Sequence, residues 1–113
     1  MKKGIDVSKY QMNIDWEKVK SQIDFAILRI GYGKYDHQKD PYFERNYNEC
    51  KRLNIPIGVY HYTYATSVSE AKQEAKLVLK WLKDKKIDLP VYFDIEESKI
   101  EKIGKQLALI HNI

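Results

Sequence analysis

Residues 89–97 read Leu89-Pro90-Val91-Tyr92-Phe93-Asp94-Ile95-Glu96-Glu97, an apolar run that starts after a proline and ends in carboxylates. Side chains alternate between the two faces of a strand, so Tyr92, Asp94 and Glu96 share one face. Charged groups are costly to bury unless they form ion pairs or belong to a functional site. Two acids on one face of such a strand are typical of glycoside hydrolysis or, less specifically, of metal binding.

Four units of a strand followed by a helix make up the sequence around this stretch. We expect strands over residues 4–8, 25–32, 57–65 and 91–96. The expected helix starts are at Asn13 or Asp15, at Asp40-Pro41, at Ser67 and at Ser98. Each start has a side chain typical of an N-cap, and both serines are followed three residues later by glutamate, as in a capping box. Strands that alternate with helices indicate a parallel sheet with right-handed crossovers.

Two architectures fit this pattern, a doubly wound sheet and part of a βα barrel. The strand faces favour the barrel, because Ile57 and Val59 oppose three tyrosines, and Ile5 and Val7 oppose Asp6 and Ser8. In a doubly wound sheet both faces would meet helices, whereas a lumen with a polar mouth explains these polar faces. We therefore expect an α/β fold, a partial (β/α) barrel of the TIM-like kind with about four βα units, as one domain over residues 1–113.

The composition limits the kinds of partner. A chain of 113 residues supports a single domain with a modest core, and 43% hydrophobic and 32% charged residues suit a globular protein. A net charge of +4 with no nucleic-acid motif gives no reason to expect a nucleic-acid partner. The single cysteine, Cys50, excludes an internal disulfide and a cysteine-rich metal site, and its helical pattern predicts a small core residue.

Three carboxylates form the candidate site. Asp6, Asp94 and Glu96 converge if the first and fourth strands open onto one mouth, where the sites of α/β sheets and barrels form. Glu96 beside apolar and aromatic walls would have a raised pKa and act as general acid. Asp94 would stay ionised and stabilise developing charge, and Asp6 would orient either group. Alternatively, the acids after the fourth strand cap the next helix, and Asp6 is a turn residue.

The tyrosine face of the third strand has two interpretations. Tyr60, Tyr62 and Tyr64 could stack on sugar rings, although aromatic strand residues are often part of the core. His61 shares its face with Ile57 and Val59, which favours a hydrogen-bonded packing role over catalysis. The other histidines have no matching ligands nearby, so histidine-bound metal is not expected.

Four ordered segments carry a resemblance to a known family. They are residues 4–11, 28–33, 56–62 and 93–96. In this order and spacing they resemble glycoside hydrolase family 25, the N-acetylmuramidases of bacterial and phage lysins. The resemblance implies an irregular βα barrel that cuts the β-1,4 bond between N-acetylmuramic acid and N-acetylglucosamine in peptidoglycan.

The resemblance also implies roles for individual residues. It gives the proton-donor role to Glu96 and supporting carboxylate roles to Asp94 and Asp6, and it places Tyr62 in the substrate groove. We assign substrate contact to Tyr32 and Tyr64 as well. No metal and no cofactor are implied. The retaining, inverting and substrate-assisted courses all fit two carboxylates that are two residues apart on a strand.

The sequence departs from the family in length. The family's barrel continues further, with another active-site Asp, and barrels usually need about 200 residues or more. We therefore expect a C-terminally truncated catalytic domain that forms a homo-oligomer through the exposed edges of its first and fourth strands. The alternatives are an inactive or self-assembling half-barrel that at most binds cell-wall glycan, and a divalent-metal site on the three acids for phosphoryl chemistry.

No signal peptide or membrane span is expected. Met1-Lys2-Lys3 is not followed by an apolar segment, because Asp6, Ser8 and Lys9 interrupt it. No apolar run approaches the length that crosses a bilayer. We expect a chain made in the cytoplasm, without a membrane partner, that acts on the bacterial cell wall outside the cell or when it is released at lysis.

Overall fold

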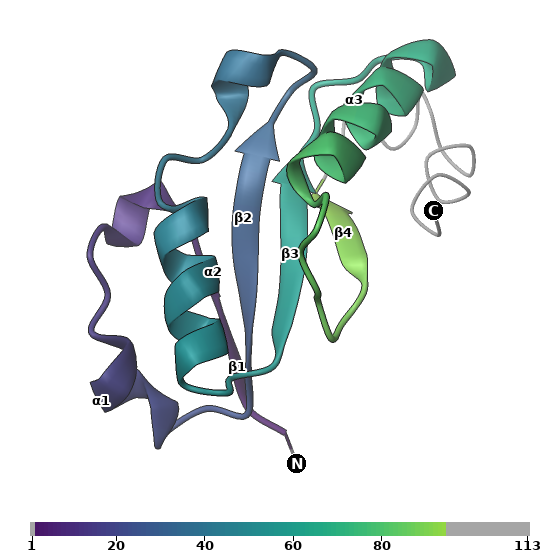
Figure 1. Ribbon diagram of the computed structural model, residues 1–113. Coiled ribbons are helices and arrows are strands. Elements are labelled where there is room, and N and C mark those ends of the chain that lie inside the picture. Colours follow the sequence, from purple (N-terminus) through teal and green to yellow (C-terminus); the bar gives the residue numbers. More distant parts are fainter. Residues whose placement is uncertain (1, 95–113) are drawn as a thin grey trace.

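The computed structural model describes residues 2–94 and shows one parallel sheet with strand order β1-β2-β3-β4 (Figure 1). The strands are β1 Gly4–Val7, β2 Phe25–Tyr32, β3 Ile57–Tyr62 and β4 Val91–Asp94. The α-helices are α1 Trp16–Lys20, α2 Phe43–Arg52 and α3 Val68–Trp81, and two 3-10 helices are η1 Lys9–Gln11 and η2 Asp36–Gln38. The expected alternation is confirmed, while the helix expected after Ser98 lies outside the described residues.

Two of the predicted helix caps are present as hydrogen bonds. The Asp15 carboxylate accepts from the backbone N–H of Lys18 at 3.3 Å, and the Ser67 hydroxyl accepts from that of Glu70 at 3.2 Å. The Glu70 carboxylate turns to Thr66 rather than to Ser67. Each cap satisfies a backbone donor that the first helical turn leaves without an intrahelical partner, so the loop-to-helix junctions are fixed locally.

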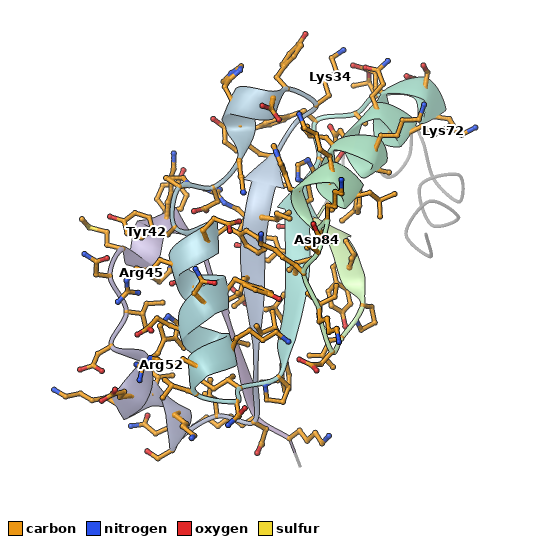
Figure 2. The ribbon with its side chains drawn as sticks, in the orientation of Figure 1. Lys34, Tyr42, Arg45, Arg52, Lys72 and Asp84 are labelled. Carbon is orange, nitrogen blue, oxygen red and sulfur yellow. The ribbon has the colours of Figure 1, made fainter. Side chains whose placement is uncertain are left out.

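Helices α2 and α3 cover one face of the sheet in Figure 1, and the core lies between them and the strands. The covered face carries the apolar residues that strand alternation predicts, with Leu28 and Val59 fully buried. From the helices, Phe43, Cys50 and Val78 pack against them. The cysteine is therefore a core residue, as predicted. Figure 2 shows Lys72 on the outer side of α3, directed into solvent, and Arg52 at the end of α2, where it pairs with Glu17 of α1 at 3.1 Å.

The sheet is a partial barrel of the TIM-like kind rather than a doubly wound sheet. Its strands lie in chain order, each paired in parallel with the next one, and both long helices lie on the same face. A doubly wound sheet reverses its strand order and has helices on both faces. Among the described residues the sheet is not closed, because β1 pairs with β2 alone and β4 with β3 alone.

A β-bulge in β2 changes which side chains share the open face. The register with β3 shifts between Arg29 and Gly31, so Ile30 and Gly31 both turn toward the helices. Gly31 is required there, because a Cβ would lie 2.6 Å from the Trp81 ring and 2.7 Å from the Gln38 carbonyl oxygen. The extra residue returns Tyr32 to the open face, where strict alternation from Leu28 would not put it.

Candidate functional site

Two of the three predicted carboxylates line one open cavity. Asp6 on β1 and Asp94 at the end of β4 border a cavity of about 410 Å³ on the face of the sheet opposite α2 and α3. The other described residues that line it are Ile27, Tyr60, Tyr92 and Phe93. The Thr63 backbone N–H donates to the Asp94 carbonyl oxygen at 3.0 Å, which fixes the backbone at this end of β4. Glu96, the third predicted carboxylate, lies outside the described residues.

Tyr60 lines this cavity, and nearby charges affect the pKa of its hydroxyl. Burial raises the pKa of its phenol, which the nearby Arg29 guanidinium partly opposes and the Asp6 carboxylate reinforces. Tyr60 pairs in register with Arg29 on one side and with Tyr92 on the other. A neutral phenol of this kind supplies an apolar ring and a hydrogen-bonding hydroxyl, which are the features that sugar ligands use.

The three tyrosines predicted to contact substrate lie together above this cavity, at the carboxyl ends of the strands. Tyr32, Tyr62 and Tyr64 line a second cavity, of about 390 Å³. The ring centroids of Tyr62 and Tyr64 are 5.2 Å apart and those of Tyr32 and Tyr64 are 6.0 Å apart, both edge to face. Tyr62 pairs with Asp94 in the β3–β4 register, so the two cavities are adjacent.

The second cavity also has basic side chains that the sequence reading did not assign to the site. Lys9 and Arg29 line it together with Tyr10. The Arg29 Nε donates to the Asp40 carboxylate at 2.8 Å, and both side chains are nearly buried. The Asp40 carboxylate also accepts from the backbone N–H groups of Lys9 at 2.9 Å and Tyr42 at 2.8 Å. Asp40 therefore joins β2 to η1 and to the start of α2.

The interpretation of Asp40 as the N-cap of α2 is corrected by these contacts. The helix begins at Phe43, and Tyr42 occupies the cap position. Asp40 instead forms an ion pair with the nearly buried Arg29 side chain of β2. The sequence contained a signal for this pair, a single arginine inside the apolar run of 25–32, but an Asp before a proline is equally typical of a helix start.

Beneath the tyrosines lies a buried polar pair on the helix side of the sheet. The His61 Nε2 lies 2.6 Å from the Gly33 carbonyl oxygen and 3.7 Å from the Glu74 carboxylate on α3. Burial lowers the pKa of His61 to about 4. The imidazole is therefore neutral near pH 7, and its contact with Glu74 is not an ion pair there. The predicted packing role of His61 is confirmed.

The Glu74 carboxylate of α3 contacts the segment that follows β3 from the helix side of the sheet. It accepts from the backbone N–H of Tyr64 at 3.1 Å. The backbone N–H of Gly33 also donates to the Tyr62 carbonyl oxygen at 3.0 Å. The loops after β2 and β3 are thus bonded to each other and to α3 directly under the tyrosine cavity.

Residues 2–94 contain neither a ready-made metal site nor a membrane-spanning helix. No group of three or more His, Cys, Asp or Glu side chains in this part of the chain is placed to hold a metal ion. None of its helices combines the length and the apolar character needed to cross a membrane.

Replacing Asp40 by Asn should destabilise the fold strongly. The substitution keeps an acceptor for Tyr42 but leaves the nearly buried Arg29 guanidinium without its counter-charge, and breaking a buried pair in this way costs about 3–5 kcal/mol. Urea unfolding measures the loss. The matched control is Asp36→Asn. Asp36 and its ion-pair partner Lys80 are largely solvent-exposed, and the amide oxygen of Asn can still accept from the Trp81 indole, so the midpoint should shift little. Equal midpoints for the two variants would contradict the assigned role of Asp40.

The buried His61 should make stability depend on pH. Its pKa is about 4 in the folded chain and about 6.5 when unfolded, so between these values the unfolded chain binds a proton that the folded chain does not. Stability should therefore fall on the order of a few kcal/mol as the pH drops from 6.5 to 4.

Unfolding midpoints measured across this range test the effect. His61→Gln should flatten the dependence, because its amide can still donate to Gly33 but does not titrate. His37→Gln, which changes an exposed ring on η2, should keep the wild-type profile. A His61→Gln variant with the full wild-type slope would show that another group causes it.

Comparison with known proteins relates the chain to a family of glycosyl hydrolases. Residues 5–111 match the family model of glycosyl hydrolases family 25. The chain is 36% identical over 100 residues to the Escherichia coli K12 protein YegX, covering 83% of this chain and 35% of YegX. It is 32% identical over 99 residues to Lysozyme M1 of Streptomyces globisporus, covering 84% and 33% respectively. The chain spans about a third of the length of these curated relatives.

Solved structures share the fold. The modular autolysin LytC from Streptococcus pneumoniae, in complex with a synthetic peptidoglycan ligand, matches with a TM-score of 0.80 and 30% identity, covering 97% of this chain and 28% of LytC. A family 25 glycosyl hydrolase from Bacillus anthracis matches with a TM-score of 0.77 and 23% identity, covering 97% and 53%. Because the family model matches nearly the whole sequence and the strands form the corresponding part of a barrel, the chain belongs to glycosyl hydrolase family 25.

Proposed function

We propose that the chain is a peptidoglycan hydrolase that cleaves the β-1,4 bond between N-acetylmuramic acid and N-acetylglucosamine. One observation carries the proposal: Asp6 and Asp94, from strands far apart in the sequence, line the same open cavity on the face of a family 25 sheet opposite α2 and α3. Carboxylates that converge on an open groove beside aromatic rings are the arrangement that glycoside hydrolysis needs.

The proposed proton donor is Glu96, two residues after Asp94. Strand alternation would place both acids on the same face, and the family membership supports the pairing. Asp94 and Asp6 would act as supporting carboxylates. As anions, they would stabilise the positive charge that develops at the sugar ring when the leaving oxygen takes up the proton.

The tyrosine cavity supports a glycan as ligand. Tyr32, Tyr62 and Tyr64 present ring faces and hydroxyls beside Asp94, which suits the apolar faces and hydroxyl rims of sugar rings. The named relatives agree with this ligand class, since one is a lysozyme and another was solved with a peptidoglycan ligand. The bacterial cell wall is then the proposed place of action.

A second candidate function is glycan binding without turnover. It is favoured by the sheet, which in the described part of the chain is not closed and leaves β1 and β4 with one paired neighbour each. An open sheet of this kind could bind a glycan strand weakly, or associate through its strand edges as the sequence reading predicted.

Digestion of purified bacterial walls tests the two functions together. Wild-type chain should release new reducing ends, and Glu96→Gln should lower the rate by about 10²-fold or more because a general acid contributes that much. Glu17→Gln, an exposed change on α1, is the control and should keep the wild-type rate.

Each other outcome has a definite meaning. Equal rates for wild type and Glu96→Gln would remove Glu96 from its role. Saturable wall binding with no reducing ends from any variant would support the binding function instead. Light scattering of the same samples gives the mass of the species assayed, and a monomer at all concentrations would exclude association through the edges.

A further inference from the structure

Four lysines form a row along the outer side of α3. Lys72, Lys76 and Lys80 are spaced four residues apart, so they lie one turn after another on the same side of the helix. The backbone N–H of Lys83 donates to the Lys80 carbonyl oxygen at 3.3 Å, which continues the turn and extends the row beyond the helix end. All four residues are exposed, and Figure 2 shows Lys72 directed into solvent. These four residues are called the α3 lysine row.

The carboxylates of α3 itself do not neutralise this row. Glu74 is buried on the inner side of the helix. Glu70, in the first turn, is paired with Lys34 at 3.2 Å. Lys80 pairs with Asp36 of η2 at 3.0 Å, and both side chains are largely exposed. Within residues 2–94 the other three lysines of the row form no ion pair, so their charges face solvent.

The neighbouring helix α2 has a different charge pattern. Its Arg52 pairs with Glu49 at 2.8 Å and with Glu17 of α1 at 3.1 Å, so bases and acids alternate there. On α3, Asp36 and the exposed Asp84 that follows the row offset only two of its four charges. Like charges four residues apart destabilise a helix slightly. The folded helix therefore gains nothing from the repeated lysines, whereas an anionic partner would relieve their repulsion.

We propose that the α3 lysine row docks a linear phosphodiester polymer of the bacterial wall, in which phosphates alternate with polyols. Lys72 and Lys80 are about 12 Å apart along the helix axis, so one extended chain can place several phosphates along the row. A lysine ammonium is a mobile point charge that binds phosphate without a fixed geometry. The row lies on the far side of the helices from Asp6 and Asp94, so docking leaves their cavity open. The choice of a wall polymer rests on the proposed place of action.

The surroundings of the row favour a linear polymer over a bilayer or a nucleic acid. On α3, all of which is described, Leu79 is the one large hydrophobic residue that is exposed, whereas helices that bind bilayers present a broad apolar face. A flat anionic surface across both helices would also meet the partly exposed Glu44 and Glu49 of α2. Single-stranded nucleic acids bind by stacking on aromatic rings, and the aromatic residue of α3, Trp81, is nearly buried.

Fluorescence anisotropy of a labelled poly(glycerol phosphate) oligomer, titrated with the full chain, tests the row. Wild type should bind at low salt and weaken as salt is added. If three or four lysines contact phosphates, the logarithm of the affinity should fall against the logarithm of the salt concentration with a slope of about −2 to −3, taking about 0.7 per contact as for single-stranded nucleic acids. An uncharged polyol of the same length should not bind. Vesicles of anionic lipid and a single-stranded oligonucleotide are the competing partners in the same assay.

Two triple variants with the same net charge locate the binding. The row variant should bind at low salt about tenfold or more weakly than wild type and lose most of the salt dependence. The control variant removes three exposed lysines near the N-terminus and on α1, away from α3 in Figure 1, and should keep the wild-type affinity. The single variant Lys76→Glu should weaken binding as well. Glutamine suits an exposed helix position, and circular dichroism checks that each variant is folded. The row variant combines Lys72→Gln, Lys76→Gln and Lys83→Gln, and the control variant combines Lys2→Gln, Lys18→Gln and Lys20→Gln.

Several results would overturn the proposal. Equal losses in the two triple variants would show that net charge, and not the row, determines binding. No binding of the polymer by wild type would also overturn it, as would tighter binding of the vesicles or the oligonucleotide than of the polymer. Poly(glycerol phosphate) contains no glycosidic bond, so these readouts do not depend on hydrolysis. Polymer binding without wall digestion would remove the hydrolase function alone, and digestion without polymer binding would remove the docking role of the row alone.

Discussion

The carboxyl edge of the sheet depends on one buried carboxylate, that of Asp40. It accepts hydrogen bonds from the side chain of Arg29 on β2 and from the backbones of Lys9 after β1 and Tyr42 before α2. Three segments that the sequence separates by up to 33 residues therefore meet at one charge. Buried ion pairs add little net stability compared with apolar packing, but they penalise any arrangement that separates the partners. The pair thus specifies how the loops around the cavities are placed.

The division of the sheet into a covered and an open face gives the site its chemistry. The helices pack on the apolar face and exclude water from His61 and Glu74. On this side of the sheet, His61 contacts the loop after β2 and Glu74 contacts the segment after β3. The open face keeps the acids and tyrosines accessible. The bulge at Gly31 helps to separate the two faces. It places a glycine against Trp81 on the covered face and returns Tyr32 to the open face. Packing on one face thereby determines the position of ligand-facing groups on the other.

Much of this was predictable from sequence, because local rules decide it. The bounds of β2, the caps at Asp15 and Ser67, and the inward side of His61 follow from periodicity and cap chemistry. The placement of Asp6 and Asp94 in one cavity also followed, because parallel strands present the same end to the same edge. The roles of the predicted site residues in substrate binding and catalysis remain predictions.

Other features depend on contacts that no local pattern contains. Asp40 has a spacing that fits both a helix cap and a buried ion pair, and only the tertiary position of Arg29 decides between them. Gly31 at the bulge packs against Trp81, which lies 50 residues further along the chain, and no local pattern contains that contact. Lys9 and Tyr10 lie in one of the segments that resemble the family, but the 3-10 turn that places them near Arg29 has no periodic signal in the sequence.

The central claim is that the face of this sheet opposite α2 and α3 binds glycan. Backbone amide NMR of the chain, titrated with a soluble peptidoglycan fragment, measures this directly. The account predicts saturable shifts at Asp6, Lys9, Tyr60, Tyr62 and Asp94, with the outer sides of α2 and α3 unchanged. Shifts confined to the helices, or none at any concentration of the fragment, would contradict it.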